Sequence, residues 1–108
     1  METIEKLKKN GIYLNENEIK QLCEKYHLIE LSVFGSAIRD DFNDDSDVDI
    51  LISFDENSTS TIWDILHLKT DLEIMLNRKV DVIEKDALQN PIRKKNILTT
   101  YEVVYAYQ

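Results

Sequence analysis

Residues 33–52, VFGSAIRDDFNDDSDVDILI, decide how the rest of the chain is interpreted. An apolar run ends at Gly35-Ser36, an acidic segment follows, and a second apolar run opens with Asp47 and Asp49. Successive side chains of a strand point to opposite faces, so both aspartates are predicted on one side of the strand. Two neighbouring carboxylates repel each other unless a cation lies between them, and such oxygen ligands suit Mg²⁺ or Mn²⁺. The pattern therefore predicts half of a metal site.

Gly35 and Ser36 supply the complementary half of a nucleotide site. A glycine lets the backbone approach a ligand closely, and a serine at the start of a helical turn offers its hydroxyl and amide to a phosphate. Arg39 lies one turn further along the chain. Its guanidinium is expected either to reach a triphosphate or to pair with Asp40 or Asp41.

Two other binding motifs do not fit this segment. Asp41, Asn43 and Asp45 have the spacing of an EF-hand calcium loop. Ser46, however, stands where that loop needs a glycine, and Ile52 stands where it needs a bidentate glutamate. A Walker phosphate loop is excluded because no Gly-Lys-Ser/Thr follows the glycine. The acidic residues between the two apolar runs are interpreted as a solvated turn.

Length and charge limit the possible functions. The chain has 108 residues, which predicts a single domain spanning 1–108 with one modest core and no separate substrate-binding module. Its formal net charge of −8 argues against direct binding to a nucleic-acid backbone. With one cysteine, no signal peptide and no long apolar span, the sequence predicts a cytosolic protein that does not associate with membranes.

The apolar pattern predicts alternating helices and strands. Residues 28–34 and 47–54 predict two strands, and the second is expected to be central because it is apolar on both faces. Further helices are predicted over 3–10, after Asn15, and from Asn90-Pro91. The tail, residues 101–107, is predicted to form an edge strand or to end a helix. A long helix is predicted from Thr61, with Trp63 on its flank. Its apolar side consists of Ile62, Ile65, Leu66, Leu68, Leu72, Met75 and Leu76.

A third strand is predicted over residues 79–83, and Asp81 faces away from its apolar neighbours there. A carboxylate in the middle of a strand is costly unless it is paired or bound to a metal. Lys79 offers an ion pair on the same face, and a metal site is the alternative. With all three strands in one sheet, Asp47, Asp49 and Asp81 can meet, as two-metal nucleotidyl transfer requires.

The order Gly35-Ser36, ten intervening residues, Asp47-Val48-Asp49 and a later Asp81 resembles the polymerase-beta-type nucleotidyltransferase superfamily. The short length and the surrounding sequence resemble its minimal nucleotidyltransferase branch. The resemblance implies an α/β (α+β) fold, a small mixed sheet flanked by helices. It also implies that Asp47, Asp49 and Asp81 are catalytic and bind two Mg²⁺ ions, or Mn²⁺, while Gly35, Ser36 and Arg39 hold ATP.

Members of that branch are often MntA-type antitoxins that act on a HEPN-domain toxin. The resemblance therefore implies an enzyme that transfers AMP from ATP to a tyrosine of a partner toxin and so silences it. Two alternatives stay open: neutralisation of the toxin by direct binding, and nucleotidyl transfer to a small molecule. The cluster Arg93-Lys94-Lys95 is interpreted as a solvated helix face. The alternative interpretation is that it faces phosphate or an acidic partner. The tyrosines of the tail suit either core packing or an interface.

Overall fold

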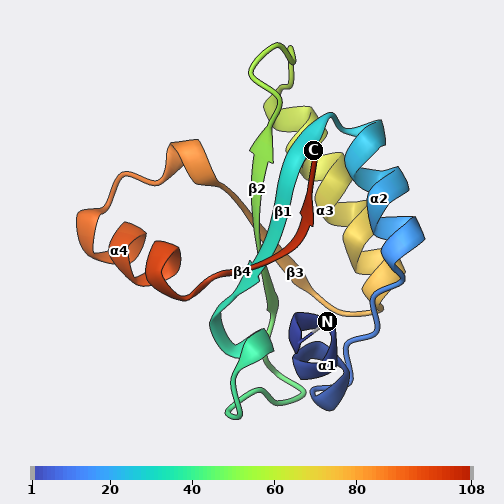
Figure 1. The fold of residues 1–108 in the computed structure, drawn as a ribbon, viewed down its shortest axis with the longest axis vertical. Helices are drawn as coiled ribbons and strands as arrows, with labels where there is room; N and C mark the ends of the chain where they lie inside the picture. Colours follow the sequence, from blue (N-terminus) through green and yellow to red (C-terminus); the bar gives the residue numbers. More distant parts are fainter. Residues whose placement is uncertain (1, 108) are drawn as a thin grey trace.

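A four-stranded mixed sheet lies at the centre of the protein, which we describe from a computed structural model covering residues 2–107 (Figure 1). The strands lie in the order β3-β2-β1-β4. β1 pairs antiparallel with β2 and with β4, and β2 pairs parallel with β3. The predicted mixed sheet is confirmed, with β2 inside it and the tail as an edge strand. The strand bounds are Leu28–Phe34 (β1), Val48–Phe54 (β2), Val80–Glu84 (β3) and Glu102–Ala106 (β4).

Two helices precede the first strand and two connect later strands, and two of the four begin at the caps that the sequence predicts. Asn15 accepts a hydrogen bond from the amide of Glu18, and Asn90 accepts from the amides of Ile92 and Arg93. In the described residues 2–107, no helix is long and apolar enough to cross a membrane. The helix bounds are Glu2–Lys9 (α1), Glu16–Lys25 (α2), Ile62–Leu76 (α3) and Pro91–Thr100 (α4), with 3₁₀ turns at Gly35–Ile38 (η1) and Lys85–Ala87 (η2).

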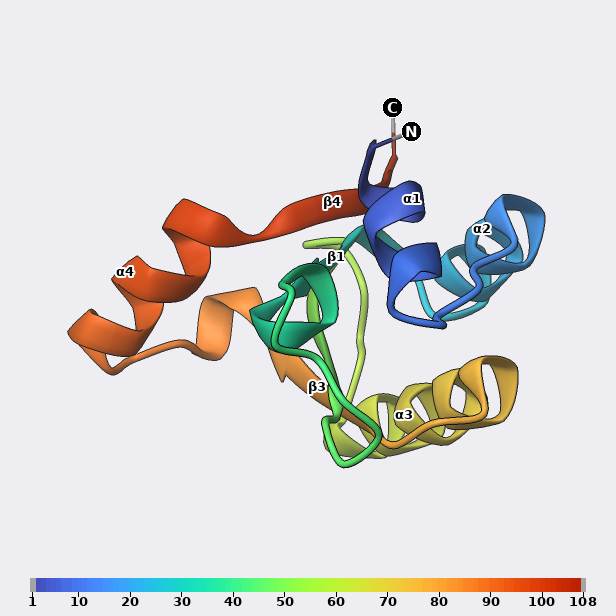
Figure 2. The same cartoon turned by 90° about the horizontal axis from the view of Figure 1, so that it is seen from below.

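One face of the sheet carries the main core. Helices α1, α2 and α3 all lie on that side of the sheet (Figure 2). The sequence overestimates how much of α3 takes part, because Ile62 and Leu66, predicted on its apolar side, are 62% and 46% exposed. Trp63, predicted on the flank, is 67% exposed. These side chains lie in the first two turns of α3 and face solvent. The buried strand and helix residues that meet in this core include Leu31, Val33, Val48, Ile50, Ile52, Leu68, Leu72 and Val80.

The opposite face of the sheet is covered less completely. α4 and the segment that leads to it from β3 lie on this side (Figure 2), which packs through a small cluster of Phe34, Leu51, Leu88 and Ile97. Because side chains alternate along a strand, the neighbours of Leu51 on this face are Asp49 and Ser53. The face that carries Asp49 is therefore the one with the smaller apolar cluster.

Candidate active site

Two of the predicted acids stand next to each other on adjacent strands. Asp49 of β2 is the register partner of Asp81 of β3, and on its other side it is the partner of Phe34 of β1. Neighbouring strands lie about 4.8 Å apart, and partners in a parallel pair point to the same face. The fold thus brings Asp49 and Asp81 side by side where β1 leads into η1.

Gly35 packs directly against one of these acids. Its φ angle is 70°, in the left-handed region that glycine tolerates best. A Cβ atom added at this position would overlap the Oδ2 atom of Asp49. The absence of a side chain therefore serves both the turn of the backbone and the close approach of the carboxylate.

The environment of Asp49 disfavours its negative charge. Burial raises the pKa of its carboxyl group, and the charges of Asp81 and Asp47 raise it further. Arg93 and Arg39 oppose this rise. Asp49 therefore feels the charges of both other predicted acids, and Arg93 from α4 lies near enough to act on it. The sequence pattern left Arg93 in a basic cluster without a role, because only the fold brings α4 to this side of the sheet.

Asp47 lies just outside the strand that the sequence assigned to it. β2 begins at Val48, whose amide donates to the carbonyl oxygen of Lys79 at 3.0 Å, and this bond starts the pairing with β3. Asp47 is exposed and lines a cavity of about 310 Å³ together with Arg78 and Lys79. Within residues 2–107, no three carboxylate, imidazole or thiol side chains lie close enough to form a ready-made metal site.

The alternative role for Asp81, an ion pair with Lys79, is not present in the described part of the chain. Asp81 is exposed and β3 is an edge strand, so its carboxylate faces solvent. The donors at this site are carboxylate oxygens, which Mg²⁺ and Mn²⁺ prefer. Burial is the largest cause of the raised pKa of Asp49, and a divalent cation would offset the further rise that the charges of Asp81 and Asp47 produce. The residues present therefore fit such a cation.

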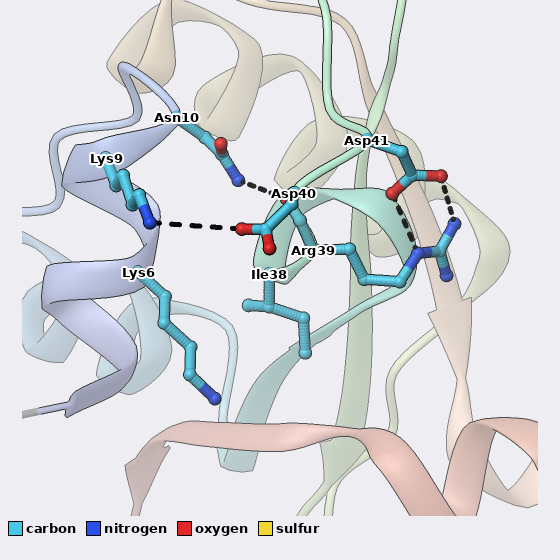
Figure 3. Close-up of a pocket in the computed structure, with 7 residues that line it drawn as sticks. All are labelled: Lys6, Lys9, Asn10, Ile38, Arg39, Asp40 and Asp41. Carbon is cyan, nitrogen blue, oxygen red and sulfur yellow. Dashed lines mark hydrogen bonds and ion pairs between the residues drawn. The ribbon is translucent and has the colours of Figure 1, made fainter.

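Arg39 is engaged by a neighbouring acid, which was one of the two outcomes expected for it. Its Nε donates to Asp41 Oδ1 at 3.0 Å and its Nη2 to Asp41 Oδ2 at 3.3 Å (Figure 3). The arginine lowers the pKa of the Asp41 carboxyl group. Both side chains are exposed, so the pair lies at the surface beside η1.

A pocket of about 730 Å³ lies between α1 and η1, next to Arg39 (Figure 3). Asn10 at the end of α1 donates from Nδ2 to the carbonyl oxygens of Ala37 at 2.8 Å and of Arg39 at 3.0 Å. These two bonds fix η1 against the first helix. The 3₁₀ turn is thereby held from both sides, by Asn10 and by the contact of Gly35 with Asp49.

Comparison with known sequences identifies relatives over most of the chain. The family model "Polymerase beta, Nucleotidyltransferase" matches residues 17–108. A provisionally named protein adenylyltransferase of Methanocaldococcus jannaschii is 40% identical over 78 residues, 72% of this chain and 78% of the relative. The protein adenylyltransferase MntA of Thermococcus cleftensis is 37% identical over 86 residues, 80% of this chain and 82% of the relative.

Solved structures share the fold at lower identity. A toxin–antitoxin structure with AMP-PNP aligns with a TM-score of 0.69 and 23% identity over 88% of this chain and 76% of that chain. A tri-AMPylated Shewanella oneidensis HEPN toxin in complex with an MNT antitoxin aligns with a TM-score of 0.61 and 20% identity over 94% of this chain and 74% of that chain. By its sequence matches, the chain belongs to the polymerase beta nucleotidyltransferase family, in the branch of small protein adenylyltransferases related to MntA.

Proposed function

We propose that this protein transfers AMP from ATP to a tyrosine of a partner HEPN-type toxin and thereby neutralises it. The observation that carries the proposal is the register pairing of Asp49 with Asp81 beside Gly35, in a chain 37% identical to an MntA adenylyltransferase. The complexes of related fold, one with AMP-PNP and one with an AMPylated HEPN toxin, support the choice of nucleotide and partner. The use of ATP also fits the cytosolic location predicted from the sequence.

In this proposal Asp47, Asp49 and Asp81 bind Mg²⁺, with Mn²⁺ as a substitute. The bound metal supplies positive charge that stabilises the phosphate oxygens during transfer. Gly35 and Ser36 approach the triphosphate from the end of β1, which the left-handed turn at Gly35 favours. Arg39 contributes a further positive charge after it leaves Asp41.

The proposed reaction is a substitution at the α-phosphorus of ATP. The tyrosine oxygen of the partner forms a bond to the α-phosphorus, the bond from that phosphorus to the oxygen bridging to the β-phosphate breaks, and pyrophosphate leaves. The proton of the tyrosine hydroxyl passes to Asp81, whose exposure on an edge strand makes it reachable from a bound partner. The acceptor is placed on the partner because a HEPN toxin in a complex of related fold carries AMP.

The test uses a HEPN-type toxin as the partner. The purified pair is incubated with ATP and Mg²⁺, and the mass of each protein is measured. We expect the partner to gain the mass of AMP at a tyrosine, and the Asp47→Asn, Asp49→Asn double variant to lose this activity. Full labelling by the double variant would contradict the assigned acids.

Neutralisation by direct binding is distinguished in cells. The partner is expressed with the wild-type chain or with the double variant, and growth is compared. Our proposal predicts protection by the wild type alone. Equal protection by the double variant would favour neutralisation of the toxin by direct binding. If the purified protein instead labelled a small molecule and left the partner unlabelled, nucleotidyl transfer to a small molecule would be favoured.

A further inference from the structure

One side chain outside the acidic loop holds the segment that leads into β2. The Nη2 atom of Arg78 donates to the carbonyl oxygens of Asn43 at 3.1 Å, Asp44 at 3.4 Å and Ser46 at 3.4 Å. The guanidinium also stacks over the ring of Phe42, with its carbon 4.5 Å from the ring centre. The loop thus wraps around a single positive group.

The carbonyl groups orient the guanidinium so that one of its own donors is left without a hydrogen bond within residues 2–107. The Nε atom of Arg78 is buried and has no hydrogen-bond partner in the described residues. A buried donor without a partner is rare because it loses its bonds to water. The convergence of carbonyl oxygens on a positive group resembles the way loops coordinate metal cations. Arg78 therefore takes the place that a bound cation would have in this loop.

The position of Arg78 in the chain connects the loop to the neighbouring strand. It follows Asn77, the left-handed residue that ends α3, and precedes Lys79, whose carbonyl oxygen accepts from the amide of Val48. The start of β3 is fixed in turn, because the amide of Val80 donates to Glu73 Oε2 at 3.1 Å. Arg78 thus joins the loop that carries Asp47 to the start of the strand that carries Asp81.

We propose that Arg78 is a positioning residue that acts as an internal cation. Its guanidinium holds residues 43–46 against the start of β3 and so sets Asp47 and Asp49 relative to Asp81. The inference rests on the proposed role of these acids in binding metal and nucleotide. A lysine would keep the charge but lose the planar stack and the fixed fork of donors, so the exchange is not conservative here.

The test compares Arg78→Ala, Arg78→Lys and a control, Lys20→Ala, which removes an exposed cation from α2. Hydrogen exchange is measured at the amides of Asp45, Ser46 and Val48, which the loop and strand bonds protect. We expect faster exchange in Arg78→Ala, an intermediate rate in Arg78→Lys and wild-type exchange in the control. Mn²⁺ affinity in the presence of AMP-PNP should fall by about 10- to 100-fold in Arg78→Ala. Low millimolar guanidinium should restore part of it.

The outcomes separate this inference from the proposed function. Wild-type Mn²⁺ affinity in Arg78→Ala would overturn the inference, whether or not the loop exchanges faster. If thermal melting shows that Arg78→Ala does not fold, the same measurement is made on Arg78→Lys. Wild-type Mn²⁺ affinity in Arg78→Lys would then overturn the inference. If the wild-type protein itself binds no Mn²⁺ with AMP-PNP, the proposed function fails. The exchange rates then still report whether Arg78 holds the loop.

Discussion

The two faces of the central sheet differ in how they are covered. On one face, α1, α2 and α3 enclose a continuous apolar core in which Leu72 and Ile50 are almost fully buried. On the other face, α4 contributes a small cluster around Leu51, and the rest of the surface carries the acids Asp49 and Asp81. The same strands serve both faces because their side chains alternate.

This difference indicates that one face of the sheet stabilises the fold and the other carries the candidate active site. Burial of apolar surface on the first face supplies most of the stability of the fold. The second face is free to carry groups that reduce stability, such as acids that repel each other near Asp49. The comparison predicts that substitutions on the two faces change the free energy of unfolding by different amounts. At the acids, it predicts that a substitution raises this free energy instead of lowering it.

The largest effect is expected from the same substitution made on each face. Leu72→Ala removes a side chain that is 0% exposed in the main core, and it should lower the free energy of unfolding by about 3 to 5 kcal/mol. Leu88→Ala, in the smaller cluster beneath α4, should cost about 2 kcal/mol. Urea denaturation of both variants measures the difference. Equal losses would contradict the assignment of stability to the first face.

A second comparison uses two glycines that share a left-handed backbone. Gly11 has φ 77° and nothing near its Cβ position, whereas a Cβ at Gly35 would overlap Asp49. Gly11→Ala should therefore cost only the backbone strain, about 1 kcal/mol. Gly35→Ala should cost about 1 kcal/mol more, because the overlap pushes Asp49 or η1 out of place. Urea denaturation measures the costs, and equal values would show that the contact between Gly35 and Asp49 is relaxed without cost.

Much of the fold follows from sequence patterns that act locally. The strand Leu28–Phe34 has the predicted bounds, and the caps Asn15 and Asn90 start their helices as expected, because these signals depend on nearby residues. The sequence pattern placed Asp47, Asp49 and Asp81 together in one sheet; the structure pairs Asp49 with Asp81 in register, while Asp47 lies just before β2. The burial of α3 was overestimated at Ile62 and Leu66, because periodicity alone does not show how much of a helix the rest of the fold covers.

Contacts between distant segments were not predictable in the same way. Arg78 has no pattern that marks it, since its carbonyl partners are backbone groups more than thirty positions earlier in the chain. Arg93 was noticed as a charge, but its effect on Asp49 depends on where α4 lies. Topology brings Arg78 beside Asp47 and Arg93 near Asp49, and local periodicity does not supply that information.

A smaller effect of opposite sign is expected at the acids. Burial and the neighbouring aspartates raise the pKa of Asp49 above its ordinary value of 3.8, so the folded protein holds this proton more tightly than the unfolded chain. Its contribution to stability therefore falls as pH rises from the ordinary to the raised value, and stays low above it. Asp49→Asn should stabilise the metal-free protein by up to about 1 kcal/mol at pH 7, since partial exposure screens the repulsion.

Thermal melting as a function of pH tests this expectation at Asp49. The gain should disappear below the ordinary aspartate pKa of 3.8. Asp86→Asn, at an exposed aspartate of η2, serves as the control and should melt like the wild type. Added Mg²⁺ should stabilise the wild type more than Asp49→Asn, because a ligand that binds the folded state stabilises it. A loss of stability in metal-free Asp49→Asn at pH 7 would contradict the repulsion.

The smallest change in stability is expected from the exposed pair of Arg39 and Asp41. Asp41→Asn removes the carboxylate that the guanidinium contacts, but both groups are hydrated, so the melting temperature should not change measurably. Affinity for ATP should rise, because Arg39 no longer has to leave an acid before it meets a phosphate. Calorimetric titration with ATP and Mg²⁺ measures this affinity at low and at high salt, and the gain in affinity should shrink as salt is added.

Asp40→Asn is the control, since Asp40 faces Lys9 at 4.0 Å instead of Arg39. If Asp41→Asn bound ATP more weakly than Asp40→Asn, the pair would be holding Arg39 in its binding position. The surface beside η1 would then be preorganised by an ion pair, as the first face of the sheet is by its core.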